Sequence, residues 1–143
     1  MNRIAEILLD WYAREGRDLP WRRTRDPYRI WLSEVILQQT RVAAVLGYYA
    51  RFLEAFPTVE AMAEADEERL LKLWEGLGYY SRARNLQKAA RCIAERGAFP
   101  DTYEDLLKLP GIGDYTASAI AAAAFGRREP AVDGNVLRVM TRL

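Results

Sequence analysis

Apolar residues recur at spacings of three and four along most of the chain, which is the pattern of amphipathic helices. Near the start, Ile4, Ile7, Leu8 and Trp11 share one side of such a helix. The same spacing, with capping residues and glycine breaks, predicts helices over about 26–40, 42–56, 81–97, 102–109 and 116–125, and others beginning at 57–58, 66 and 135. No strand-like alternation persists, so we expect an all-α fold.

A chain of 143 residues is expected to form one domain, residues 1–143. We divide it into an N-terminal helix with an arginine-rich linker, 1–25, and a core, 26–143. Of its residues, 50% are hydrophobic and 29% are charged, an ordinary globular composition. No apolar run approaches the length of a membrane span, and no signal-peptide pattern opens the chain. We therefore expect a cytoplasmic, intracellular protein with no membrane partner.

The net charge of +1 gives no global case for a nucleic-acid partner, but the charge is unevenly placed. A short segment holds Arg14, Arg17, Arg22, Arg23, Arg25 and Arg29. This segment could follow a phosphate backbone, or it could be a solvated polar linker. The chain has one cysteine, Cys92, and no histidine, which excludes an internal disulfide and a cysteine-built metal site. We expect no metal ligands, so catalysis must depend on carboxylates, amides, hydroxyls and cations.

A Pro-Gly-x-Gly turn lies between Leu109 and an alanine-rich stretch. Pro110 has no N–H, and Gly111 and Gly113 readily take positive φ, so this turn interrupts the helices around it. The following helix presents free backbone N–H groups and a positive dipole end, which suit a phosphate. Residues 102–125 thus fit a helix-hairpin-helix that grips the DNA backbone, and the alternative is a plain tight turn.

Glu34 lies on a predicted helix that is apolar almost all round, with Trp31, Leu32, Val35 and Ile36 on its broad apolar face. Such a helix is usually buried, so we expect the carboxylate in a poorly solvated place. Desolvation raises the pKa of a carboxyl group and favours the protonated form that a general acid needs. The alternative is a buried salt bridge to one of the arginines.

Asp133 stands directly before the last predicted helix, a common position for a capping aspartate. A capping carboxylate stays ionised and can still face a pocket. An ionised Asp133 facing a neutral Glu34 would suit the cleavage of a glycosidic bond. The spacing of the two residues in the sequence leaves open whether they meet.

Other polar and aromatic residues carry two interpretations each. Gln38, Gln39 and Thr40 end an apolar helix, where amides could bond to base edges or simply supply C-terminal polarity. A second glycine turn, from Gly76 to Tyr80, precedes a helix that we expect Ser81 to cap. Its tyrosines, and Trp21, could stack on bases or belong to the core. Trp11, Trp31 and Trp74 lie on apolar faces and are predicted core residues.

Taken in order, five segments resemble the helix-hairpin-helix DNA glycosylase superfamily, and within it the adenine DNA glycosylase (MutY-type) branch. These segments are Leu19-Pro20-Trp21-Arg22, residues 31–40, residues 74–82, residues 109–117 and Val132-Asp133-Gly134-Asn135-Val136. The resemblance implies a helical barrel and an enzyme of base excision repair. It also implies a duplex DNA partner that contains a mispaired adenine, and with it a nucleoid-associated location.

By this resemblance, the enzyme is a monofunctional glycosylase that removes adenine mispaired with 8-oxoguanine. The adenine is flipped into a pocket where Glu34 protonates it at N7 and Asp133 stabilises the sugar cation. Tyr115 and Asn135 line that pocket, and Gln39 and Tyr79 insert into the duplex. The residues expected to contact DNA are Gly111, Gly113, Gln38, Gln39, Thr40, Tyr79, Trp21 and Arg22.

Two features of this chain differ from those of other members of the superfamily. The related endonuclease III branch has a lysine at the position of Tyr115, and a tyrosine has no amine for a Schiff base. An endonuclease III-like glycosylase-lyase is therefore a disfavoured alternative. Most of the superfamily holds a four-iron four-sulfur cluster on four cysteines beyond the last motif, and Cys92 matches none of them.

The resemblance also implies a C-terminal domain that recognises 8-oxoguanine. We therefore expect this chain to be the N-terminal portion of a longer enzyme, in which the first helix would pack on the cluster domain. Without that surface, the apolar stripe of the first helix is expected to be exposed, which would favour self-association of an otherwise monomeric protein. A catalytically silent helix-hairpin-helix module that only binds DNA is the remaining alternative.

Overall fold

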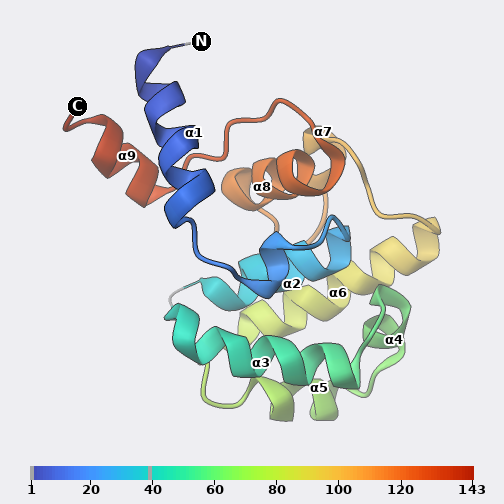
Figure 1. The fold of residues 1–143 in the computed structure, drawn as a ribbon. Helices are drawn as coiled ribbons and strands as arrows, with labels where there is room; N and C mark the ends of the chain where they lie inside the picture. The colour runs from blue at the N-terminus through green and yellow to red at the C-terminus, as the bar shows by residue number, and fades with distance from the viewer. Residues whose placement is uncertain (1, 39) are drawn as a thin grey trace.

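The computed structural model describes residues 2–38 and 40–143. Their elements are α1 (Arg3–Glu15), the 3₁₀ helix η1 (Pro20–Arg22), α2 (Pro27–Leu37), α3 (Val42–Ala55), α4 (Val59–Glu64), α5 (Glu67–Trp74), α6 (Tyr80–Arg96), α7 (Tyr103–Leu107), α8 (Asp114–Phe125) and α9 (Gly134–Met140). No strand occurs among these residues, so the predicted all-α class is confirmed (Figure 1).

Helix α2 is central to the packing. It contacts α3, α8 and η1, while α6 packs on α4 and α5, and α7 packs on α8 (Figure 1). Trp31, Leu32 and Ile36 of α2 are almost completely buried together with Phe52 of α3 and Trp74 of α5. A helix that buries this much apolar surface is rigidly held, which matters because α2 also carries Glu34.

Polar caps explain where most helices begin. The side chains of five predicted residues accept a backbone N–H of the first helical turn: Asp26, Thr58, Asp66, Thr102 and Asp133. Most other predicted boundaries lie within two residues of the observed ones, but two differ clearly from the structure. Ser81 does not cap α6, because Tyr79 occupies the N-cap position in a left-handed conformation. Helix α2 ends at Leu37 rather than near Thr40, because the backbone of Gln38 is extended.

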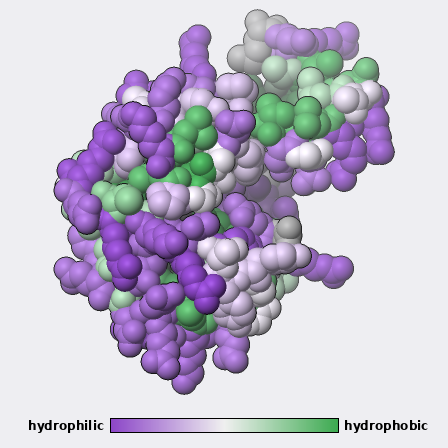
Figure 2. All heavy atoms as spheres, turned by 180° about the vertical axis from the view of Figure 1, so that it is seen from behind, coloured by the Kyte–Doolittle hydropathy of each residue, from purple (hydrophilic) through white to green (hydrophobic). Residues whose placement is uncertain are grey.

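Helices α1 and α9 present apolar side chains to solvent. Neither has a buried residue, and Ile4, Ile7 and Trp11 are 45%, 58% and 52% exposed. The apolar groups on the lobe that these helices form are visible from behind the molecule (Figure 2). The expected exposed stripe is confirmed, whereas the prediction of Trp11 in the core is wrong, because no described element covers this face of α1.

None of the described helices combines the length and the apolarity that a membrane crossing requires.

Candidate active site

An open cavity of about 660 Å³ lies between α2, the start of α8 and the start of α9. Six of the residues predicted from the sequence line it: Glu34, Tyr115, Asp133, Asn135, Trp21 and Arg22. The fold therefore brings together the two carboxylates whose meeting the sequence left open.

Glu34 occupies a poorly solvated position on α2, as the helix pattern predicted. Burial raises the pKa of its carboxyl group to about 7, and the negative charge of Asp133 adds to this effect, while a hydrogen bond from the Tyr115 hydroxyl lowers it. Within residues 2–38 and 40–143, Glu34 forms no ion pair with an arginine. The alternative of a buried salt bridge is therefore not supported. A carboxyl group with this pKa can hold a proton near neutral pH and donate it.

Tyr115 stands in the first turn of α8 and lines the same cavity as Glu34. Burial and the two nearby carboxylates raise the pKa of its hydroxyl to about 12. The side chain is therefore a neutral hydrogen-bond donor at physiological pH. It can orient the Glu34 carboxyl group, but it offers no amine for covalent chemistry.

Asp133 caps α9, as predicted. Its Oδ1 accepts a hydrogen bond from the N–H of Val136 at 2.9 Å, in the position where a helix N-terminus favours negative charge. Asn135 lies within the first turn of the same helix, is exposed, and also lines the cavity. The predicted helix start thus brings a carboxyl group and an amide to the cavity that Glu34 also lines.

The arginine-rich segment divides between the cavity and the surface. Three of its members line the cavity: Arg17, Arg22 and Arg25. By contrast, Arg23 pairs with Asp18 at 2.6 Å and Arg29 pairs with Asp26 at 3.7 Å, in exposed positions. The arginines that line the cavity are compatible with phosphate binding, whereas the paired arginines on the surface fit the solvated polar linker. The sequence analysis did not name Arg17 and Arg25 as site residues. Their positions on either side of the Leu19-Pro20-Trp21-Arg22 motif could have indicated that they lie near the site.

Trp21 belongs to the core as well as to the cavity wall. It is 8% exposed, and its ring meets that of Tyr49 edge to face at 5.3 Å between centroids. This burial favours the core interpretation over insertion into a duplex. Any contact of Trp21 with a ligand would occur inside the cavity.

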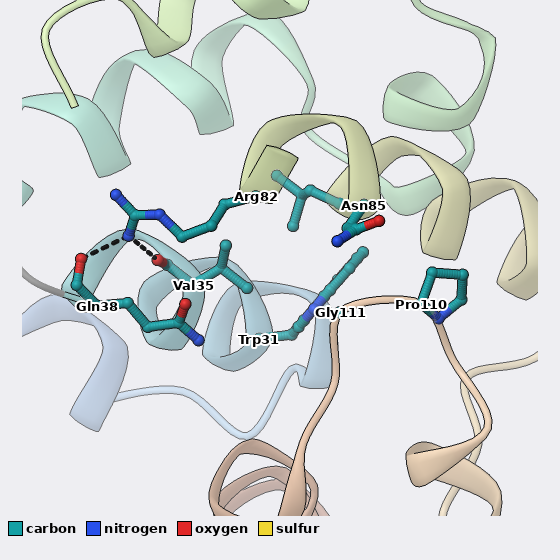
Figure 3. A pocket seen from close by; sticks show the side chains of 8 residues that line it. Trp31, Val35, Gln38, Arg82, Asn85, Pro110 and Gly111 are labelled. Atoms are coloured by element: carbon teal, nitrogen blue, oxygen red, sulfur yellow. Dashed lines mark hydrogen bonds between the residues drawn. The ribbon is translucent and has the colours of Figure 1, made fainter. Parts of the chain in front are cut away.

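A separate junction joins the end of α2, helix α6 and the Pro110–Gly111 turn around a small cavity of about 40 Å³ (Figure 3). Gln38 and Gly111 line this junction, away from Glu34. Gly111 has a φ of 76°, and a Cβ at this position would lie 2.8 Å from Cβ of Asn85. Glycine is therefore required here both for its backbone conformation and for close packing. The expectation of positive φ is wrong for Gly113, whose φ is −96° and whose surroundings are open.

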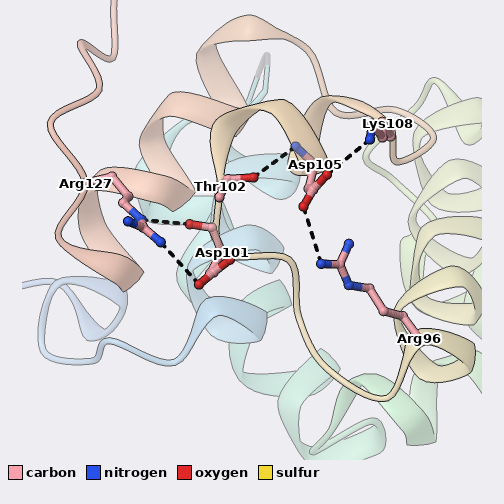
Figure 4. Close-up of polar contacts among 6 residues, drawn as sticks. All are labelled: Arg96, Asp101, Thr102, Asp105, Lys108 and Arg127. Carbon is pink, nitrogen blue, oxygen red and sulfur yellow. Dashed lines mark hydrogen bonds and ion pairs between the residues drawn. The ribbon is translucent and has the colours of Figure 1, made fainter.

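The hairpin between α7 and α8 is braced by ion pairs on both sides (Figure 4). Asp105 of α7 contacts Lys108 at 3.2 Å and Arg96 of α6 at 3.4 Å, and these two cations lower the pKa of its carboxyl group. Asp101, just before α7, pairs with Arg127 after α8 at 3.2 Å. These exposed pairs link the hairpin to its neighbours, although each contributes little to stability.

The other predicted DNA-contacting residues that the structure describes lie outside the lining of the larger cavity. Tyr79 is 67% exposed on its glycine turn, and Tyr80 is 39% exposed, so the two tyrosines are not core residues. The Thr40 hydroxyl donates to the carbonyl of Gln38 at 3.3 Å. Gln39 lies outside the described residues.

Metal ligands are sparse in the described part of the chain. Cys92 is exposed, and no group of three or more His, Cys, Asp or Glu side chains there could hold a metal ion. The residues present do not fit the four-cysteine cluster that the resemblance implies, and we assign no step to such a group.

The chain is similar to known DNA glycosylases over most of its length. Adenine DNA glycosylase of Homo sapiens is 50% identical over 157 residues, which cover 98% of this chain and 29% of that protein. The adenine DNA glycosylase of Buchnera aphidicola subsp. Baizongia pistaciae is 42% identical, with 96% of this chain and 40% of the relative covered. The chain thus spans less than half the length of these relatives.

Solved structures give the same fold. A thermostable thymine-DNA glycosylase superposes with a TM-score of 0.89 at 31% identity, covering 96% of this chain and 64% of that chain. A trapped covalent intermediate of endonuclease III with DNA superposes with a TM-score of 0.82 at 28% identity, covering 100% and 70%. Residues 32–143 match the HhH-GPD superfamily of base excision DNA repair proteins. With this match over most of its length and a glycosylase fold, the chain belongs to the HhH-GPD superfamily.

Proposed function

We propose that this chain is the catalytic core of a monofunctional DNA glycosylase, which hydrolyses the N-glycosidic bond of adenine mispaired with 8-oxoguanine or guanine in duplex DNA. One observation carries the proposal: a carboxyl group with a pKa near 7, Glu34, shares a cavity with the helix-capping carboxylate Asp133. Two carboxyl groups in such different environments suit the cleavage of a glycosidic bond. The adenine DNA glycosylases among the relatives support the choice of base.

In this mechanism the two carboxyl groups act on opposite ends of the bond. Glu34 donates its proton to N7 of the flipped adenine, so the bond between N9 and C1′ breaks with its electron pair leaving on a neutral base. The anionic Asp133 stabilises the positive charge that develops on the sugar. Water then bonds to C1′, and its proton returns to the Glu34 carboxylate, which completes the hydrolysis.

Tyr115 supports hydrolysis without strand cleavage. Its hydroxyl is neutral and its interaction with Glu34 lowers the pKa of that carboxyl group, so we assign it the role of orienting the acid. A lyase step needs an amine nucleophile that forms a Schiff base with the sugar, and a tyrosine cannot supply one. Borohydride trapping of a covalent complex through this position is therefore not expected.

Duplex DNA as the partner has separate support. The endonuclease III structure that shares this fold is a complex with DNA. Three arginines line the cavity, and arginine pairs well with phosphate. The glycine turn before α8 leads into a helix N-terminus that suits a phosphate of the DNA backbone.

Single-turnover excision tests the proposed chemistry. The chain is incubated with duplexes that carry adenine opposite 8-oxoguanine, beside an A·T duplex, and strands are then cleaved with alkali. We expect alkali-dependent cleavage at the mispaired adenine alone, and its loss in Glu34→Gln with duplex binding retained. Binding without any cleavage by the wild-type chain would favour the catalytically silent DNA-binding module.

Binding to DNA can be tested apart from the chemistry with two glycines of positive φ, one inside this turn and one outside it. Gly111→Ala forces a left-handed alanine against Asn85, so we expect the turn to shift and duplex affinity to fall by about tenfold or more. Gly97→Ala is the matched control, because its φ is also positive, at 84°, nothing lies within 4 Å of the new Cβ, and it caps the C-terminus of α6 rather than this turn. Equal affinities of the two variants in a fluorescence-anisotropy titration would contradict the role of this turn.

A further inference from the structure

The turn that carries Tyr79 is held in an unfavourable backbone conformation. Tyr79 has a φ of 48°, and it is the sole non-glycine residue with positive φ among residues 2–38 and 40–143. A bulky residue adopts this conformation only when its surroundings impose it. Its ring is nevertheless 67% exposed, so packing of the ring does not supply the restraint.

Arg82, in the first turn of α6, supplies much of that restraint. Its Nη2 donates to the carbonyl of Leu77 at 3.2 Å, and its backbone N–H donates to the carbonyl of Tyr79 at 2.9 Å. The guanidinium group lies over the rings of Tyr79 and Trp74, at 5.9 and 5.0 Å from their centroids. The Trp74 indole N–H donates to the carbonyl of Gly78 at 2.8 Å, so each carbonyl from residue 77 to residue 79 has a donor.

The same guanidinium group also holds the end of α2. Its Nη1 donates to the carbonyls of Val35, at 3.1 Å, and Gln38 (Figure 3). Carbonyls at a helix C-terminus lack partners within the helix and carry partial negative charge, which a cation offsets. Glu34 lies one residue before Val35 on this helix. One side chain therefore links the turn of Tyr79 with the helix of the proposed acid.

We infer that Arg82 is a positioning residue that clamps the exposed Tyr79 turn to the C-terminal end of α2, and so couples duplex contact at Tyr79 to the placement of Glu34. This inference rests on the proposed function and adds a residue to it. A planar guanidinium fork is needed, because a lysine ammonium group is a single point charge and cannot bridge both sites in one plane. Arg82 is part-buried with Nη1 and Nη2 directed to carbonyls, so it acts through the protein rather than on DNA.

A double-mutant cycle between Arg82 and Tyr79 tests this coupling. Duplex affinity and single-turnover excision are measured on the A·8-oxoguanine duplex for Arg82→Lys, Tyr79→Ala and the double variant. We expect Arg82→Lys to weaken binding and to slow excision at saturating protein by about tenfold each. In the Tyr79→Ala background, the effect of Arg82→Lys on affinity should largely vanish, because both changes remove the same positioned group.

Arg84→Lys is the matched control. Arg84 lies two residues further along α6, is exposed, and pairs with Glu67 at 3.3 Å on the surface. We expect this change to alter affinity and rate by less than about twofold. The pH at which excision begins to fall should be the same in Arg82→Lys as in the wild type, because the proton donor itself is unchanged.

If Arg82→Lys does not fold, Trp74→Phe gives the same test, since it removes the hydrogen bond to Gly78 and retains an aromatic ring. An undiminished effect of Arg82→Lys or Trp74→Phe on affinity in the Tyr79→Ala background would overturn the inference. Coupling in affinity without any excision by the wild-type chain would overturn the proposed chemistry and leave the clamp supported. Excision by the wild type with no coupling would overturn the clamp alone.

Discussion

Glu34 and Asp133 line the same cavity from opposite environments. Glu34 projects from α2, a helix surrounded by the core, whereas Asp133 stands at the start of α9, a helix without a buried residue. Burial raises the pKa of Glu34 to about 7. Asp133 instead accepts a backbone hydrogen bond at a helix N-terminus, where negative charge is favoured.

This contrast shows how position divides two carboxyl groups into an acid and an anion. The apolar residues around Glu34 on α2 form part of the core. Their burial also desolvates the Glu34 carboxyl group, which raises its pKa and favours the protonated form. The cap at Asp133 serves α9, and the hydrogen bond it makes suits an ionised side chain. The anion also raises the pKa of Glu34, so the two roles reinforce each other. The experiments below break or sharpen this division, beginning with the largest effect.

Removing the charge of Asp133 should eliminate the anionic member of the pair and its stabilisation of the sugar cation. Asparagine is as good an N-cap as aspartate, so Asp133→Asn should keep α9 and lose only the negative charge. We expect single-turnover excision to fall by about 10² to 10³-fold, the range found when one stabilising group is removed from a transition state. The rate at saturating enzyme measures this directly. A rate within tenfold of the wild type would contradict the role of Asp133.

The raised pKa of Glu34 should also be visible in the pH dependence of the free energy of unfolding. The folded state binds the Glu34 proton more tightly than the unfolded state, whose reference pKa is 4.5, so wild-type stability should decrease as pH rises from about 4.5 to about 7. The decrease is on the order of 2 to 3 kcal/mol. Glu34→Gln should abolish it, as measured by urea unfolding across this range. The exposed Glu95→Gln is the control and should leave the decrease in place.

The capping role of Asp133 predicts a smaller effect on stability. Asp133→Ala leaves the N–H of Val136 without its side-chain acceptor, so the free energy of unfolding should decrease by about 1 kcal/mol relative to Asp133→Asn. Urea unfolding of the two variants at one pH measures the difference. Equal stabilities would mean that the cap contributes nothing to α9.

The smallest effect concerns the Tyr115 hydroxyl. This group lowers the pKa of Glu34, so Tyr115→Phe should raise that pKa. Excision should then persist to higher pH than in the wild type, with a change of less than about tenfold at neutral pH. A pH–rate profile of the variant reports the direction. A shift to lower pH would show that the hydroxyl does not stabilise the Glu34 anion.

Local features of this molecule were predictable from the sequence. The caps at Asp26, Thr102 and Asp133 follow from side-chain hydrogen bonds that span two or three residues, and the burial of α2 follows from its apolar periodicity. The desolvated position of Glu34 could be inferred for the same reason. These properties depend on short-range interactions that a sequence displays directly.

Properties set by tertiary contacts were not predictable. The meeting of Glu34 and Asp133 depends on how α2 packs on α8 and on the path of the chain from α8 to α9. Trp11 has the periodicity of a core residue, but no described element covers its helix face. The left-handed Tyr79, which displaced Ser81 as the cap of α6, depends on Arg82 and Trp74 holding the turn.

The pH dependence of single-turnover excision tests the central claim most directly. If a protonated Glu34 is the acid, the rate on the A·8-oxoguanine duplex should fall about tenfold per pH unit above about pH 7, where its proton is lost. The residual rate of Glu34→Gln should show no such decrease. A wild-type rate that stays constant or increases through pH 7 to 9 would contradict Glu34 as the proton donor.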